Sequence, residues 1–177
     1  LVTPEDELGK GAELSIEELE QQIGSIQVPY ARSSAGRHLA RHYLEQGEYD
    51  KAIEYYRQAL DAEGLSDVAN REMLRELSQV YLVKGDYAAA TRTLERALAV
   101  ELVPEATDYL LLAQAYYRQK KYVKVVVSLD GIAKAGLELN PPQMHQAVAL
   151  YYSAGAFSQG EVLLRRLLEL EPNNPDN

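Results

Sequence analysis

The stretch Tyr43-Leu44-Glu45-Gln46-Gly47-Glu48-Tyr49 decides the fold of this chain, because its spacing of aromatic residues returns three more times. An aromatic residue, five others and a second aromatic residue occur again from Tyr81, Tyr116 and Tyr151. The four copies start roughly 35 to 38 residues apart, a period typical of stacked units of two helices each. The sequence therefore predicts a helical repeat.

Small and apolar residues flank each copy at helical spacing. In the first two copies a small residue stands three positions before the first aromatic residue and three after the second, and further apolar residues follow about one turn apart. These residues are Ala40, Ala52, Tyr56 and Ala59 in the first copy, and Ser78, Ala90, Leu94 and Ala97 in the second. Small side chains let two helices approach closely, and aromatic ones fill the space between neighbouring pairs. Each copy should therefore be the turn between two packed helices.

A glycine stands where the first helix of three of the four repeats ends. Gly47, Gly85 and Gly155 occupy this position, where a left-handed backbone costs little only for glycine. Lys120 stands there in the third repeat, which also has a β-branched run at 125–127. We therefore expect a looser or shifted turn in the third repeat, with both of its helices retained.

These spacings are similar to those of the tetratricopeptide repeat (TPR), which has a period of 34 residues. Tyr109 stands at the place of the family's tryptophan, and Pro172 at that of its proline. The resemblance covers about residues 33 to 174. It implies an all-α, right-handed superhelical solenoid of four helix-turn-helix repeats and a role as an interaction scaffold. The repeats lie near 33–70, 71–105, 106–140 and 141–174, in a TPR domain at 33–177.

The N-terminal part before the repeats is predicted to contain one more helix. Ser15 and Glu18 form the capping-box pattern of a helix that would run to about Ile26 and cap the first repeat. We assign residues 14–32 to this helix and a linker. Residues 1–13 lack a sustained apolar period, so we expect a flexible leader there.

The last helix of the fourth repeat carries a cluster of leucines. They are Leu163, Leu164, Leu167, Leu168 and Leu170. Some of them would face solvent unless a further domain or a second copy covered them, because solenoids need a polar end. We therefore expect that a homo-oligomer can form through the C-terminal helix.

Composition excludes several classes of function. The formal net charge of -9 argues against nucleic acid as a partner, and no run approaches the roughly 18 apolar residues of a membrane span. Cysteine is absent, which excludes thiolate catalysis and cysteine-based zinc sites. The absence of cysteine does not separate a periplasmic from a cytoplasmic location.

The sequence contains no complete motif for catalysis or for binding a cofactor. His38 and His42 lie one helical turn apart as in zinc proteases, but the glutamate of that motif is absent. The run Gly9-Lys10-Gly11 lacks the spacing and the preceding strand of a phosphate-binding loop. We therefore predict that the protein is not an enzyme and has no catalytic residue, no metal and no cofactor.

The first helices of the repeats are predicted to line a concave groove that binds a protein or peptide. The candidate binding residues are Arg37, Arg41, Arg75, Gln79, Gln114, Tyr117, Arg118 and Tyr152. Four arginines in one groove of an acidic protein would suit a peptide that bears carboxylates. The alternative is that these arginines only pair with Glu45, Glu72 and Glu76 on the same surface.

A narrower resemblance is to bacterial periplasmic TPR proteins encoded beside TonB, ExbB and ExbD. It rests on residues 71–81 and 109–117, with Ala149-Leu150-Tyr151-Tyr152 and Leu168-Glu169-Leu170-Glu171-Pro172. This likeness implies a periplasmic accessory of TonB-dependent uptake. The alternative is an assembly factor for a secretion, pilus or polysaccharide-export complex of the envelope.

One TPR subclass, the cochaperones of chaperones, does not fit. These proteins hold a C-terminal carboxylate with lysine, asparagine and arginine side chains. At the corresponding positions this sequence has Arg37, Arg41, Glu76, Thr107 and Leu111. The carboxylate clamp of that subclass is therefore absent.

Overall fold

The computed structural model describes residues 14–100 and 102–172, and within these ranges every regular element is a helix and no strand occurs. The predicted all-α class is confirmed. The chain divides into two compact units, Leu1–Lys84 and Gly85–Asn177. The leader expected at residues 1–13 lies outside the described residues, and the handedness of a superhelix over all four repeats stays a prediction.

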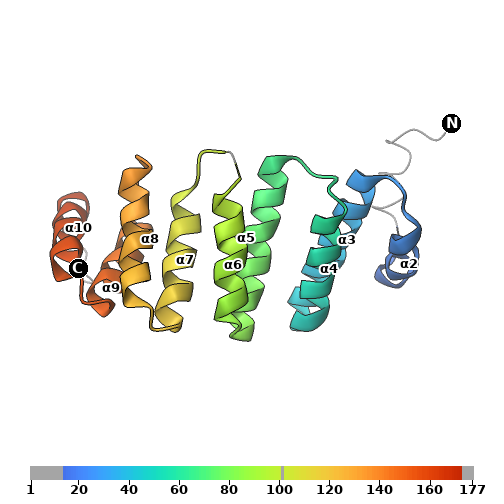
Figure 1. The fold of residues 1–177 in the computed structure, drawn as a ribbon, viewed down its shortest axis with the longest axis horizontal. Helices are drawn as coiled ribbons and strands as arrows, with labels where there is room; N and C mark the ends of the chain where they lie inside the picture. Colours follow the sequence, from blue (N-terminus) through green and yellow to red (C-terminus); the bar gives the residue numbers. More distant parts are fainter. Residues whose placement is uncertain (1–13, 101, 173–177) are drawn as a thin grey trace. The chain divides into compact units, whose positions relative to one another are not determined.

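The first unit contains three long helices, preceded by a short leading helix and a 3-10 turn (Figure 1). Its elements are α2 (Ile16–Gln22), the 3-10 helix η1 (Ile23–Ser25), α3 (Pro29–Glu45), α4 (Tyr49–Asp61) and α5 (Asp67–Lys84). Helix α3 packs against α4, and α4 packs against α5. The predicted small residues serve this packing, because Ala40, Ala52 and Ala59 are almost completely buried.

Helices α3 and α4 approach each other closely. A Cβ atom added to Gly36 in α3 would lie 2.9 Å from the Cβ of Ala59 and 3.1 Å from the carbonyl oxygen of Tyr55. Ser33, one turn earlier in α3, donates a hydrogen bond of 2.7 Å to the carbonyl of Ala59. Residues without large side chains are therefore required along this contact.

The leading helix α2 covers the free side of α3. The predicted capping box is confirmed, since Ser15 accepts from the backbone N–H of Glu18 and donates its own backbone N–H to the Glu18 carboxylate. Leu19 is buried against Leu39. The helix is shorter than expected, because α2 ends at Gln22 and only a 3-10 turn follows. Helix α3 begins at Pro29, so the first repeat starts inside the segment assigned to the linker.

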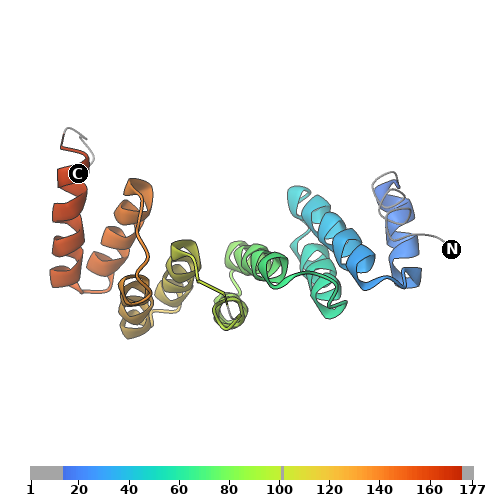
Figure 2. The same cartoon turned by 90° about the horizontal axis from the view of Figure 1, so that it is seen from above.

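The second unit consists of one helix followed by two helical hairpins (Figures 1 and 2). Its elements are α6 (Tyr87–Leu98), α7 (Ala106–Arg118), α8 (Tyr122–Lys134), α9 (Pro141–Ser153) and α10 (Phe157–Leu170). Helix α7 packs against α6, α8 and α9, and α9 packs against α10. Leu129 and Met144 are fully buried between these helices.

The turn between α7 and α8 differs from our expectation. Lys120 takes a left-handed backbone with φ +59°, close to the φ values of +75° at Gly47 and +77° at Gly155. The β-branched run at 125–127 lies within the continuous helix α8, with Val125 fully buried. The sequence therefore placed this turn correctly, but lysine takes the conformation that glycine has elsewhere.

Hydrogen bonds confirm that this turn is neither looser nor shifted. The backbone N–H of Lys121 donates to the carbonyl of Tyr116 at 3.0 Å, and the N–H of Ala156 donates to that of Tyr151 at 2.9 Å in the fourth repeat. This is the bond that closes a helix end with a left-handed residue. The expected distortion was wrong because the lysine side chain points to solvent and leaves these backbone bonds intact.

Replacing Lys120 by glycine should make the protein more stable. A left-handed L residue costs about 1 kcal/mol or more, and the greater freedom of glycine in the unfolded chain cancels part of the gain. We expect Lys120→Gly to raise the free energy of unfolding in urea by about 0.5 kcal/mol. Gly155→Ala, the reciprocal control, should lower it. A Lys120→Gly protein less stable than the parent would contradict a strained turn.

Candidate functional site

Two of the predicted binding residues meet at one carboxylate in the first unit. Arg37 donates two hydrogen bonds to Glu76, at 2.6 and 3.2 Å, and a third to Glu72 at 3.3 Å. Arg41 also forms an ion pair with Glu76. The hydroxyl of Tyr56 donates to the same carboxylate at 3.1 Å. Glu76 on α5 is thus the centre of a cluster that connects α3, α4 and α5.

Electrostatics at Glu76 favour its charged form. Burial alone would raise the pKa of Glu76, whose side chain is 22% exposed, but the hydrogen bonds and charges of Arg37 and Arg41 outweigh it and lower the pKa. The same hydrogen bonds raise the pKa of both arginines. For these two arginines the structure therefore supports the alternative that they pair with glutamates of their own surface.

The other six candidates lie on α5, α7 and α9. Arg75 and Gln79 lie on α5 with Glu76, where Arg75 is half-buried and Gln79 is exposed. The other four predicted residues, which are Gln114, Tyr117, Arg118 and Tyr152, belong to the second unit. The structure thus divides the candidate residues into two sets of four.

Glu76→Gln tests the strength of the cluster and has a defined pH dependence. A carboxylate with a lowered pKa in the folded state stabilises the protein above its ordinary pKa of 4.5, and this stability is lost as the pH falls through the lowered value. We expect the variant to lose about 1 to 2 kcal/mol of unfolding free energy at pH 7, and the difference from the parent should shrink below pH 4 or so.

The control for this variant is Glu45→Gln, at an exposed position near the end of α3. Its unfolding free energy in urea should stay close to that of the parent at both pH values. A Glu76→Gln protein as stable as the parent at pH 7 would show that the cluster contributes nothing.

Two pairs of aromatic rings are exposed in the second unit. Tyr117 on α7 and Tyr152 on α9 occupy equivalent positions in their repeats and are 36% and 39% exposed. Each contacts the first residue of the next helix, since the Tyr117 and Tyr122 ring centroids are 6.1 Å apart and those of Tyr152 and Phe157 are 5.7 Å apart. Because α7 packs against α9, the two aromatic pairs lie on neighbouring hairpins.

Packing holds Tyr152 in place. A Cβ atom on Gly160 of α10 would lie 2.8 Å from the Tyr152 ring. The ring therefore packs directly against the backbone of α10 at Gly160. The repeat register indicated Tyr117 and Tyr152 as surface residues, but it was not used to find their neighbours Tyr122 and Phe157. The signal was present, because these two residues are the second aromatics of the repeated motif.

Arg118 has a different environment from Arg37 and Arg41. Its Nη2 donates to the hydroxyl of Tyr87 at 2.5 Å, and its guanidinium carbon lies 4.9 Å from the centre of that ring. Gln114, one turn earlier on α7, is half-buried. Arg118 therefore has neutral aromatic groups as neighbours, where Arg37 and Arg41 have the carboxylate of Glu76.

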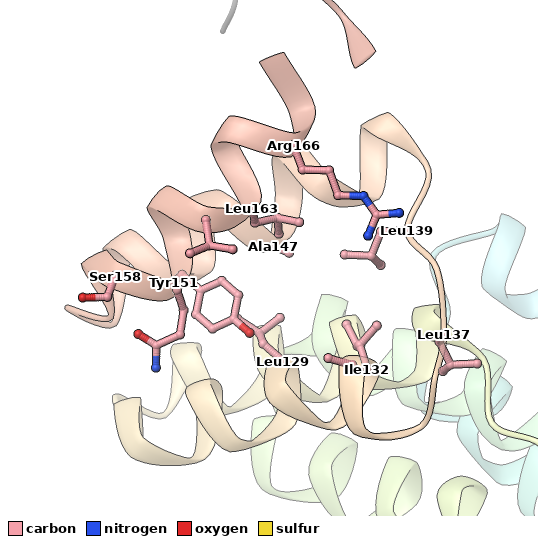
Figure 3. A pocket seen from close by; sticks show the side chains of 12 residues that line it. Leu129, Ile132, Leu137, Leu139, Ala147, Tyr151, Ser158, Leu163 and Arg166 are labelled. Carbon is pink, nitrogen blue, oxygen red and sulfur yellow. The ribbon is translucent and has the colours of Figure 1, made fainter. Parts of the chain in front are cut away.

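A hollow of about 470 Å³ lies between α8, α9 and α10 (Figure 3). Its lining includes Leu129, Ile132, Leu139, Ala147, Leu163 and Arg166. Arg166 reaches over the opening toward Leu139 and lies 3.7 Å from a carboxylate oxygen of Glu138. The sequence pattern did not indicate this hollow, because three helices form it together. Its lining suits an apolar group.

The described residues contain no helix long and apolar enough to cross a membrane. In the same part of the chain, no three histidine or acidic side chains gather in a way that could hold a metal ion.

Comparison with protein families identifies the repeat. The family model described as tetratricopeptide repeat matches residues 37–99 and 75–124, within the region where the sequence pattern and the helical hairpins coincide. The chain is a tetratricopeptide-repeat protein. Among curated proteins, none matches its sequence significantly.

Solved structures with TPR-like repeats resemble the chain in fold. The nearly identical TPR-like repeats of a Podosopora anserina protein described as a kinesin light chain have a TM-score of 0.70 and 20% identity, with 96% of this chain and 91% of that chain covered. The structure of MamA has a TM-score of 0.68 and 18% identity, covering 100% and 99%. For BtubC from P. vanneervenii the TM-score is 0.62 and the identity 19%, covering 94% and 77%.

Proposed function

We propose that this TPR protein is a non-enzymatic scaffold that holds a peptide segment of another protein, and that the aromatic pairs of the second unit make the main contact. The observation that carries this is the exposure of Tyr117 and Tyr152 at equivalent positions of adjacent repeats. Tyrosines are enriched at protein interfaces, where they bury a large area and lose little conformational entropy. Such rings on neighbouring hairpins suit an extended or helical segment.

The arginines contribute unequally in this proposal. A carboxylate of the partner would compete with Glu76 for Arg37 and Arg41, because these side chains already form ion pairs. Arg118 has an aromatic hydroxyl and ring as its neighbours, so it is the better donor to a partner. The predicted contacts of Arg75, Gln79 and Gln114 stay predictions.

Tyr117→Ala should weaken the binding of a protein partner. A partner is first captured from envelope extract on the immobilised chain, identified and purified. We then expect Tyr117→Ala to reduce its affinity about tenfold, as for an interface residue that contributes about 1.4 kcal/mol. Titration calorimetry measures the dissociation constants.

Tyr30→Ala is the matched control, because Tyr30 is 47% exposed and belongs to the first unit, whereas the aromatic pairs belong to the second. It should bind the partner as the parent does. Equal affinities of Tyr117→Ala and the parent would contradict the role of the aromatic pairs.

For the cellular role, we propose a periplasmic accessory of TonB-dependent uptake. The support is the resemblance in residues 71–81 and 109–117, which belong to α5 and α7, the first helices of the second and third repeats. The alternative stays an assembly factor for a secretion, pilus or polysaccharide-export complex. The identity of the captured partner separates the two.

Cell fractionation tests the proposed location. An antibody to the native protein should find it in the periplasmic fraction of the source bacterium, together with a periplasmic marker enzyme. Recovery with a cytoplasmic marker would contradict both envelope roles and leave the scaffold role intact.

We also propose that two copies associate through α10. Leu164 is only half-buried, whereas Leu94 and Leu129, its equivalents in α6 and α8, are almost completely buried. Leu168 and Leu170 are exposed on the same helix. Sedimentation velocity should detect a dimer that Leu168→Glu disrupts, and a strict monomer at high concentration would contradict it.

A further inference from the structure

We propose that the turn between α7 and α8 docks an acidic segment of the partner protein. This basic turn comprises residues 117–124, in which Arg118, Lys120, Lys121 and Lys124 supply positive charge and Tyr117 and Tyr122 supply apolar area. The inference rests on the proposed function, because it names the chemistry of the segment that the second unit would hold.

Charge is concentrated in this turn against the trend of the chain. The formal net charge of the protein is -9, yet residues 109–129 contain the four cations of the basic turn and no aspartate or glutamate. All four cationic side chains are exposed. A negatively charged segment would therefore meet a local field opposite in sign to that of the whole protein.

Three of the four cations of the basic turn lie beside neutral groups. Arg118 lies over the Tyr87 ring, Lys124 lies 5.0 Å from the centre of the Tyr116 ring, and Lys121 donates to the side-chain oxygen of Gln119 at 2.6 Å. Within the described part of the chain, no carboxylate forms an ion pair with any of the four. Their charge thus remains available to a partner, unlike that of Arg37.

The backbone of Lys120 provides an independent observation. Three repeats have glycine at this position, whereas the third has a lysine with φ +59°. A non-glycine residue in this region destabilises the fold, and such residues cluster at functional sites. The lysine adds nothing to the turn itself, which has the same backbone hydrogen bonds as the fourth repeat. What lysine adds at this position is its exposed side chain with a positively charged end.

The start of α8 adds to the positive potential. The positive end of a helix dipole is usually accompanied by acidic side chains, but the first turn of α8 contains none and its N-cap residue is Lys121. Lys124 lies in the same turn. A carboxylate of a bound segment would therefore be attracted by the dipole and by the lysines together.

The chemistry of the basic turn favours an acidic protein segment over a longer polyanion. The charge of -9 on the whole chain repels nucleic acid and anionic membranes, so only a short segment can exploit four cations. Tyr117, Tyr122 and Val123 are exposed beside these cations. A segment that alternates carboxylates with apolar side chains would satisfy both features.

The test uses a fluorescein-labelled decapeptide of alternating glutamate and leucine and the complete chain. Fluorescence anisotropy at low salt should show binding that weakens as salt rises. We expect the variant Lys120→Gly with Lys121→Gln to bind about tenfold more weakly, although the first substitution stabilises the turn. The matched control is Arg92→Gln with Lys134→Gln, which removes two exposed charges elsewhere in the second unit. It should change the affinity less than about twofold.

Several results would overturn the proposal. They are no binding of the peptide, equal weakening by both double variants, and lysine-dependent binding of phosphatidylserine vesicles or single-stranded DNA in place of the peptide. Binding of the captured partner to two variants distinguishes this inference from the proposed function. If Tyr152→Ala weakens partner binding and the lysine variant does not, the scaffold stands and the docking site is wrong. If neither variant weakens it, both are wrong.

Discussion

The close approach of the two helices in each hairpin is the constraint on which the remaining structure depends. A Cβ atom on Gly36 would nearly collide with Ala59 on the facing helix, and Ala40, Ala52 and Ala113 are completely buried. Because the backbones lie this close, the chain must reverse direction in a very short turn. A left-handed residue at the end of the first helix achieves this, and φ is positive at Gly47, Lys120 and Gly155.

The hairpin geometry also determines where functional side chains can lie. Residues at the end of one helix and the start of the next are brought together at the turn, so Tyr117 meets Tyr122 and Tyr152 meets Phe157. Their neighbours in the motif, Tyr116 and Tyr151, point into the core. One repeated motif therefore supplies both a packing residue and a surface residue, and the surface residues recur on adjacent hairpins.

Charge is distributed differently in the two units. In the first, Glu76 joins Arg37 and Arg41 into a cluster that links α3 to α5. In the second, the cations at 118–124 lie beside aromatic rings and an amide. An acidic protein that carries such a turn can select partners by local charge, because the Debye length at physiological salt is only about 8 Å.

The sequence by itself determined the helical repeat, the hairpin turns and the capping box at Ser15, because each depends on residues a few positions apart. It also placed Tyr117 and Tyr152 on the surface from the repeat register. Only the tertiary structure decided which group Arg37 pairs with, since its partner Glu76 lies 39 residues away in the chain, on another helix. The same holds for Lys120: local propensity predicted a distorted turn, but the helix pairing on either side imposes the left-handed backbone.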